Sequence, residues 1–269
     1  MDYVAPATLD EAYRALASED ARCLAGGQSL VAMMNLGLVS PARLVSLRRI
    51  EALRGIDLQG DGSLRIGAMT THAELAALDV AAAGPSLLAQ AARVLAYPAV
   101  RAWGTIGGSV AHADPAADYP VALVAADATI EVASASGTRR IAAQDFFRGL
   151  FETALAMGEI VTAVHVPAGA EQAGAAYEKL SMVAGDFAIV SVAAIAGRTA
   201  QVAVGGFGTK PIRLARIDVS DDALLNAGRA LAAGNEPPSD HRASAAYRRR
   251  VLPELIRRAV RIALTRTRA

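Results

Sequence analysis

The sequence predicts an α+β protein of two parts, and three observations support this fold class. Short helical and strand-like patterns alternate from the N-terminus to about residue 167. A stretch rich in Pro, Gly and Ala, without periodicity, follows between Pro167 and Gly174. Beyond it several strand patterns precede a helical end, which is typical of an antiparallel sheet covered by helices. We therefore expect one domain over residues 1–167 and a second over 172–269.

Helices in the first part are predicted from their start and stop signals. Thr8 and Glu11 form a capping-box pattern before a run that ends at Ala17, and Thr71 with Glu74 repeats the pattern. A further apolar helix is expected over residues 85–96, and a proline follows it at position 98. Four strands and one more helix complete this part, at residues 22–25, 44–47, 64–67, 129–132 and 121–126.

The second part predicts a meander of strands followed by helices. Strand patterns lie at residues 176–179, 188–196 and 201–204, with a glycine turn at 205–208, and we expect the remainder to be helical. The last helix is basic and amphipathic, with nine arginines between Arg242 and Arg268. Its arginines are expected either to form a solvated face on the domain or to contact another subunit.

The composition excludes several classes of protein. The 269 residues are 53% hydrophobic and carry a net charge of +1, so a core can form and nucleic acid is disfavoured as a partner. The single cysteine, Cys23, cannot build a disulfide framework or ligate an iron–sulfur cluster, and we expect it to be buried and inert in a reducing, cytoplasmic setting. Neither a secretory signal nor a membrane span is expected, because polar and helix-breaking residues interrupt the longest uncharged stretch, residues 23–42.

Two glycine-rich segments are the candidate site. The first, AGGQSL, covers residues 25–30, and the second, GTIGGS, covers residues 104–109, which we expect to be too glycine-rich for regular structure. Paired glycines let backbone N–H groups converge on phosphate oxygens without a cationic side chain. Ser29, Thr105 and Ser109 add hydroxyl groups. The segments could hold the two phosphates of a dinucleotide, although each glycine pair could instead form only a turn.

Other catalytic patterns are missing from the sequence. It contains no Gly-x-Gly-x-x-Gly after a strand, no P-loop, no Gly-x-Ser-x-Gly elbow and no metal-ligand spacing among its four histidines. Asp114 and Asp118 are separated by Pro115, so we expect hydrogen-bond acceptors for loop N–H groups or sugar hydroxyls rather than an acid–base pair. No catalytic residue and no metal site are predicted.

Together these segments resemble the FAD-binding medium subunit of molybdenum hydroxylases, the family of xanthine dehydrogenases and aerobic carbon monoxide dehydrogenases. AGGQSL is similar to the first flavin-binding loop of the family, and TIGG running into ADPAAD (residues 105–118) is similar to the second. The resemblance covers nearly the whole chain. It implies the FAD-binding vanillyl-alcohol-oxidase or PCMH-type fold, in which two subdomains, here about 1–53 and 54–167, hold FAD and a C-terminal domain of antiparallel sheet and helices covers one side.

The resemblance also implies which residues contact FAD. Those of the first segment would contact the diphosphate and ribityl chain, flanked by two leucines: Leu24, Ala25, Gly26, Gly27, Gln28, Ser29 and Leu30. Those of the second would line the opposite side: Thr105, Gly107, Gly108, Ser109, His112 and Asp114. Asp118 would accept hydrogen bonds from the cofactor. Val161 would pack near the flavin or adenine. Lys179 would lie close to the isoalloxazine and stabilise the reduced ring by Coulomb attraction, although it could instead be a solvated strand residue. Ser181 to Ala184 stand where many relatives carry arginines, so any contact of those arginines is in doubt here.

The implied function is that of a flavoprotein subunit in a heteromeric molybdenum-containing dehydrogenase. Its partners would be a large molybdenum-cofactor subunit and a small [2Fe-2S] subunit, and electrons would pass through FAD to a quinone, NAD or oxygen. Two alternatives stay open. A stand-alone FAD oxidase of the same fold would need its own substrate pocket with acid and base residues, and a non-catalytic binding module would use the glycines only for turns.

Overall fold

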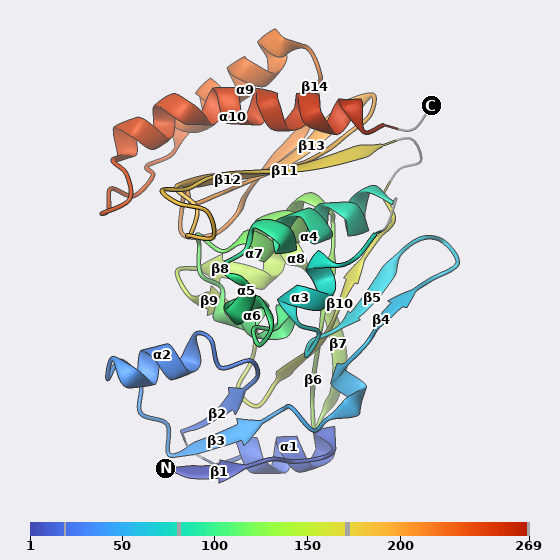
Figure 1. The fold of residues 1–269 in the computed structure, drawn as a ribbon, viewed down its shortest axis with the longest axis vertical. Coiled ribbons are helices and arrows are strands. Elements are labelled where there is room, and N and C mark those ends of the chain that lie inside the picture. Colours follow the sequence, from blue (N-terminus) through green and yellow to red (C-terminus); the bar gives the residue numbers. More distant parts are fainter. Residues whose placement is uncertain (19, 80–81, 170–172, 268–269) are drawn as a thin grey trace.

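In the described part of the chain, the three sheets that have more than two strands follow one another along the long axis of the molecule, each with its own helices (Figure 1). The computed structural model describes residues 1–18, 20–79, 82–169 and 173–267. The expected domain start at 172 and Arg268 lie outside the described residues.

The N-terminal unit is a three-stranded parallel sheet with the order β1–β3–β2. Its elements are β1 (Asp2–Val4), α1 (Leu9–Leu16), β2 (Ala21–Leu24), α2 (Leu30–Asn35) and β3 (Arg43–Ser46). The capping box predicted at Thr8 and Glu11 is confirmed at the start of α1. Helix α2 projects from the unit, and its residues are half-buried or exposed (Figure 1).

The second unit is a five-stranded antiparallel sheet with the order β4–β5–β10–β6–β7, covered by helices on one face. Its strands are β4 (Ile56–Leu58), β5 (Leu64–Gly67), β6 (Thr129–Ser134), β7 (Gly137–Ala142) and β10 (Ile160–Val166), with a small hairpin of β8 (Phe147–Gly149) and β9 (Glu152–Thr153). Its helices are η1 (Glu51–Leu53), α3 (His72–Ala76), α4 (Ala83–Val94), α5 (Pro98–Arg101), α6 (Ile106–His112), α7 (Asp118–Ala125) and α8 (Ala143–Phe146).

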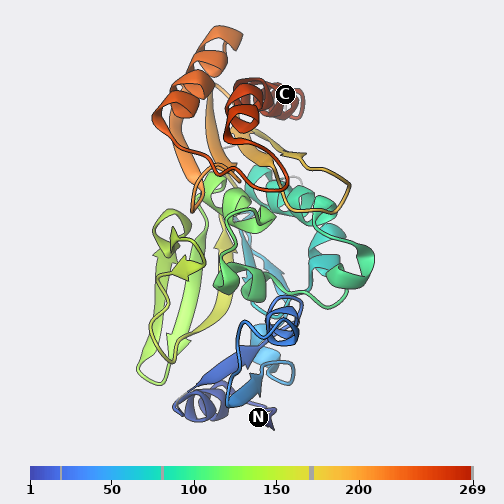
Figure 2. The same cartoon turned by 90° about the vertical axis from the view of Figure 1, so that its left-hand side faces the viewer.

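The C-terminal unit is a four-stranded antiparallel meander made of β11 (Gly174–Leu180), β12 (Val190–Ala196), β13 (Thr199–Gly205) and β14 (Ile212–Asp218), of which the sequence predicts the first three strands. Helices α9 (Asp221–Gly234) and α10 (Ala245–Thr265) cover one face, and α4 and α7 pack on the other (Figures 1 and 2). Every residue of α7 is buried because this helix lies between two sheets. Within the described ranges, none of the helices combines the length and the apolar character needed to cross a membrane.

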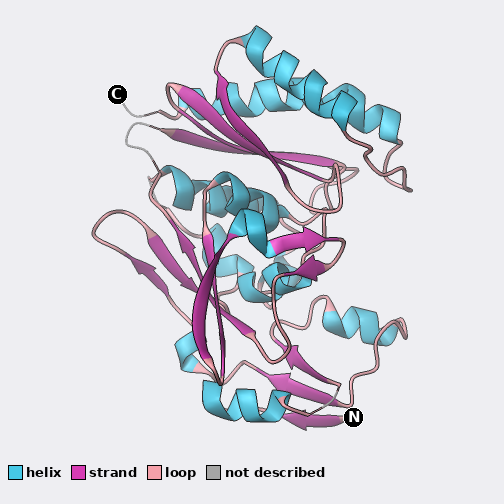
Figure 3. Ribbon diagram, turned by 180° about the vertical axis from the view of Figure 1, so that it is seen from behind, coloured by secondary structure: helices cyan, strands magenta, loops and turns pink. Residues whose placement is uncertain are grey.

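Two sequence predictions are wrong, one in the second unit and one in the C-terminal unit. Residues 106–112 form helix α6, although glycines were expected to prevent regular structure, because Thr105 caps the helix and tertiary contacts fix its first turn. Residues 212–218 form strand β14 rather than a helix (Figure 3). Ile212, Leu214 and Ile217 pack on the C-terminal core, while the ladder with β13 supplies the backbone partners.

The basic last helix is largely paired within the chain. Arg248 is buried at 1% exposure and donates to the carbonyls of Ile189 and Gly206 and to Asp240. Other arginines of α10 pair with carboxylates of α9, β11 or α10 itself: Arg257 with Asp221 and Glu254, Arg258 with Glu178, and Arg261 with Asp221. The helix therefore uses much of its charge to hold the C-terminal unit together.

Candidate functional site

The two glycine segments, far apart in the sequence, lie against each other in the structure. A Cβ atom at Gly26 would collide with the carbonyl oxygen of Trp103 and lie 2.8 Å from the Cα of Gly104. A Cβ at Gly108 would lie 3.5 Å from the Cβ of Ala25. Because Gly26 has no side chain, the backbones of the two segments can make this contact.

The backbone N–H groups of the two segments are used differently. Among the described residues, the N–H groups of residues 26–30 donate no hydrogen bond to protein. In the second segment, Ile106 donates to the Thr70 carbonyl (3.0 Å) and Gly107 to the Ala68 carbonyl (2.8 Å). Gly108 donates to Oγ1 of Thr105 (3.2 Å). The expectation that both segments present free amides is therefore wrong for the second, whose donors already have protein partners.

Close packing against the segment at 68–72 explains the glycines of α6. A Cβ at Gly107 would lie 2.5 Å from the Cβ of Ala68. The N–H of His72 donates to the Gly104 carbonyl (3.0 Å), and an isolated bridge pairs Thr71 with Thr105. These contacts hold the second segment in place, and the side chain of Ser109 is half-buried.

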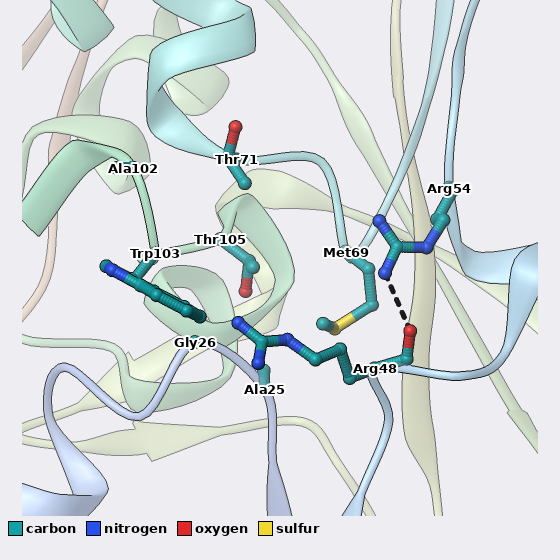
Figure 4. Close-up of a pocket in the computed structure, with 9 residues that line it drawn as sticks. All are labelled: Ala25, Gly26, Arg48, Arg54, Met69, Thr71, Ala102, Trp103 and Thr105. Carbon is teal, nitrogen blue, oxygen red and sulfur yellow. Dashed lines mark hydrogen bonds between the residues drawn. The ribbon is translucent and has the colours of Figure 1, made fainter.

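A cavity of about 350 Å³ opens where the N-terminal unit meets the second unit (Figure 4). It is lined by Ala25, Gly26, Arg48, Arg54, Met69, Thr71, Ala102, Trp103 and Thr105. The guanidinium carbon of Arg48 lies 4.2 Å from the centroid of the Trp103 ring, and Arg54 donates to the Arg48 carbonyl (2.6 Å). A second hollow, of about 320 Å³, also borders Gly26 and is lined by Gly27, Gln28 and α2 residues Val31, Ala32 and Asn35.

Cationic side chains therefore stand beside the first glycine segment, contrary to the expectation of a site without them. Sequence reasoning missed Arg48 and Arg54 because neither lies in a glycine motif. Both follow β3, where the chain passes from the first sheet to the second. A sequence signal for this part of the cavity was Trp103, the single tryptophan of the chain, which directly precedes the second segment.

Asp118 and Lys179 are paired with each other in the buried junction between α7 and β11. Nζ of Lys179 lies 3.0 Å from Oδ2 of Asp118, and the Tyr177 hydroxyl donates to Oδ1 (2.8 Å). The two charged side chains are only 5% and 4% exposed. Burial raises the pKa of Asp118, and the Lys179 and Tyr177 contacts oppose this shift. The solvated alternative for Lys179 is thus wrong, and its charge is balanced by a carboxylate.

The remaining predicted residues lie in several parts of the first two units. Asp114 accepts from the N–H of Ala116 (2.8 Å) in the turn after α6. The His112 ring stacks at 5.0 Å on Phe151, and burial lowers the pKa of His112. Val161 is 4% exposed in the core of the second unit and does not line the cavity. Cys23 is half-buried rather than buried as predicted, and its burial still raises its pKa to about 12, so the thiol stays protonated near neutral pH.

The buried side chain of His72 packs against the backbone of the second segment. His72 is 5% exposed, and a hydrogen bond of 3.1 Å joins its Nδ1 to the Tyr119 hydroxyl. Burial, together with the nearby charge of Arg101, lowers the pKa of His72 to about 4. A Cβ at Gly104 would lie 2.5 Å from Nε2 of His72. The neutral imidazole therefore packs directly under the backbone of the second segment.

Comparison with known proteins identifies the family. Residues 1–169 match the family described as the FAD binding domain in molybdopterin dehydrogenase, and residues 175–263 match the CO dehydrogenase flavoprotein C-terminal domain. The chain belongs to this family. It is a medium FAD-binding subunit of the multi-subunit molybdenum hydroxylases, an oxidoreductase chain whose cofactor is FAD.

Relatives with different substrates share the whole chain. It is 36% identical to the glyceraldehyde dehydrogenase medium chain of Sulfolobus acidocaldarius, over 96% of each chain. Carbon monoxide dehydrogenase from Hydrogenophaga pseudoflava has a similar solved chain (34% identity, TM-score 0.93, covering 100% of this chain and 98% of that one). Quinoline 2-oxidoreductase from Pseudomonas putida 86 has another (32% identity, TM-score 0.90, covering 98% and 97%). The expected PCMH-type architecture with its C-terminal domain is confirmed.

The residues where the two glycine segments meet fit FAD. The dinucleotide carries an anionic diphosphate, and the first glycine segment offers N–H donors that bond to none of the described residues. The adjoining cavity has a volume in the range of small-molecule sites and places two guanidinium groups beside those donors.

Proposed function

We propose that this subunit carries electrons from [2Fe-2S] clusters on a partner subunit through FAD to an external acceptor. The chain has one cysteine, so it cannot itself ligate such a cluster. The observation that supports FAD at the junction most strongly is the contact of the two glycine segments next to unbonded N–H groups.

The proposed binding residues come from the two glycine segments with their flanking residues, the turn after α6, and positions on α7, β10 and β11. They are Leu24, Ala25, Gly26, Gly27, Gln28, Ser29, Leu30, Thr105, Gly107, Gly108, Ser109, His112, Asp114, Asp118, Val161 and Lys179. The N–H groups of residues 26–30 would hold the diphosphate, and the side chains of α6 would border the opposite side. Asp118 and Lys179 would act through their mutual pair, which anchors the start of α7 close behind the second segment.

FAD, when bound, supplies the ability to accept electrons singly and to release them in pairs. The chain's own residues bind and orient it and limit the access of water. No catalytic acid, base or nucleophile is assigned to this subunit, because substrate chemistry would take place on the molybdenum subunit.

The proposed partners are a large molybdenum-cofactor subunit and a small [2Fe-2S] subunit. Exposed apolar side chains near the first segment support a docking role, among them Val31, Leu36 and Leu38 on and after α2, at 42%, 74% and 68% exposure. The acceptor would be a quinone, NAD or oxygen. A reducing, cytoplasmic setting completes the proposal and agrees with the single unpaired Cys23.

Purification with and without co-expressed partner chains tests the proposal. We expect a yellow chain with flavin close to one per chain, which small organic substrates reduce only when the partner subunits are present. Direct reduction of the isolated chain by such a substrate would favour a stand-alone oxidase. A colourless chain that FAD cannot reconstitute would favour a binding module.

A further inference from the structure

The backbone at Gly104 lies between the first glycine segment and a buried imidazole. On one side, a Cβ at Gly26 would lie 2.8 Å from the Cα of Gly104. On the other side, a Cβ at Gly104 would lie 2.5 Å from Nε2 and 2.6 Å from Cδ2 of His72. Gly26, the Gly104 backbone and the His72 ring therefore form three layers in close contact. Because such packing leaves no free space, a shift of the ring would be passed on to the contact between the glycine segments.

The His72 ring is itself fixed by its surroundings. Its Nδ1 and the Tyr119 hydroxyl share a hydrogen bond of 3.1 Å, and the Tyr119 side chain is fully buried in α7. The main chain of His72 adds a second tie, because its N–H donates to the Gly104 carbonyl (3.0 Å). Since the pKa of His72 is lowered to about 4, the ring is uncharged near neutral pH and needs no counter-ion in the interior.

The flat ring meets two needs at once. An aliphatic side chain at position 72 would leave the buried Tyr119 hydroxyl without this partner, and a smaller one would leave a space behind Gly104. We propose that His72 is a positioning residue for cofactor binding, which holds the Gly104 backbone against Gly26 and so keeps the two glycine segments in the arrangement that binds FAD. The inference rests on the proposed function, because it concerns how the same site is held. It does not place His72 in contact with the cofactor.

Asparagine and glutamine at position 72 separate the two edges of the imidazole. The amide of His72→Asn can occupy the place of Nδ1 and bond to Tyr119, but it leaves the space behind Gly104 unfilled. The longer side chain of His72→Gln reaches the place of Nε2 and fills that space. Titration of the flavin-free full chain should show FAD binding weakened roughly tenfold in His72→Asn, because FAD must then order the second segment itself. His72→Gln should recover most of the affinity.

A second measurement needs no cofactor. Trp103 is the only tryptophan and directly precedes Gly104, so the emission spectrum of the flavin-free chain should shift in His72→Asn. Leu224→Ala is the control, because Leu224 is fully buried in the core of the C-terminal unit and does not pack on the glycine segments. It should lower the urea midpoint through the cavity that it creates, but leave FAD affinity and Trp103 emission unchanged.

A double-mutant cycle tests the contact itself. Gly104→Ala alone should weaken FAD binding, because its Cβ meets the imidazole, whereas the smaller side chain of His72→Asn leaves room for this Cβ. The losses of the two single variants should therefore exceed, when added, the loss of the double variant. If His72→Asn does not fold, Gly104→Ala compared with Gly60→Ala, which has open space around it, tests the same contact, and equal FAD affinities of these two would overturn the proposal.

The outcomes separate the two proposals. A folded His72→Asn chain with unchanged FAD affinity and unchanged Trp103 emission would overturn the positioning role and leave His72 a role in stability alone. Equal losses of FAD affinity in His72→Asn and Leu224→Ala, or additive losses in the cycle, would also overturn it. If the unmodified chain binds no FAD while Trp103 emission still shifts in His72→Asn, the proposed function fails and the hold of His72 on Gly104 stands.

Discussion

Replacing Lys179 by Met should destabilise the junction between α7 and β11 even when no cofactor is bound. The substitution removes the ammonium group 3.0 Å from Asp118 and leaves a carboxylate that is 4% exposed, with the Tyr177 hydroxyl as its remaining partner. Breaking a buried ion pair from one side costs about 3–5 kcal/mol, because an uncompensated charge stays in the interior. We expect the free energy of unfolding to fall by this amount.

Urea unfolding of the flavin-free chain measures the effect. With a slope of about 3 kcal/mol per molar urea, the midpoint should fall by about 1 M or more. Lys210→Met, at the only other lysine and in an exposed turn, is the control and should leave the midpoint unchanged. Adding Asp118→Asn to Lys179→Met should restore part of the loss, because the second change removes the buried charge. A Lys179→Met chain with an unchanged midpoint but weaker FAD binding would refute this reasoning and favour a direct cofactor contact.

Three further predictions concern the glycine contact, the buried histidine and the buried arginine. Gly26→Ala should weaken FAD binding by roughly 5- to 150-fold in a titration, because the added Cβ meets the Trp103 carbonyl. Gly60→Ala, at a position with open space around it, is the control. Equal FAD affinities of the two variants would contradict the contact of the glycine segments. The pKa of His72 is lowered to about 4 in the folded chain, so the unfolded chain binds a proton more readily. The free energy of unfolding should therefore fall by about 3 kcal/mol as the pH drops from 6.5 to 4. His72→Gln should flatten this part of the plot of urea midpoint against pH, and an unchanged slope would contradict the assignment. Arg248→Met should lower the free energy of unfolding by about 3 kcal/mol in urea, because two carbonyls and Asp240 lose their hydrogen-bond donor. Arg250→Met, at an exposed position, is the control and should leave it unchanged. Equal urea midpoints for the two variants would contradict a stabilising role of Arg248.

Local signals were sufficient where a segment carries its own start and core pattern. The capping boxes at Thr8 and Thr71 begin α1 and α3 as the sequence predicts, since both partners of each box lie within one turn. Three of the four strands of the C-terminal meander, β11, β12 and β13, are also predicted from their apolar runs. Helix α6 was not, because its glycines are explained by Ala68 and His72, which contact it from another part of the chain.

The candidate site shows the same division. The position of both glycine segments follows from the sequence, because paired glycines with neighbouring hydroxyls are a local feature. The sequence does not show which N–H groups are free, because the carbonyls of Thr70 and Ala68 accept those of Ile106 and Gly107 across a tertiary contact. The meeting of Arg48 with Trp103 likewise depends on how the first unit sits on the second.

Hydrogen–deuterium exchange at single-residue resolution, with and without FAD, tests most directly whether the first glycine segment binds the diphosphate. The N–H groups of residues 26–30 have no protein partner within the part of the chain that the structure describes, whereas those of residues 106–108 have one. FAD should therefore slow exchange strongly at 26–30 and change it little at 106–108. Unchanged exchange at 26–30 in a chain that has bound FAD would show that the cofactor lies elsewhere.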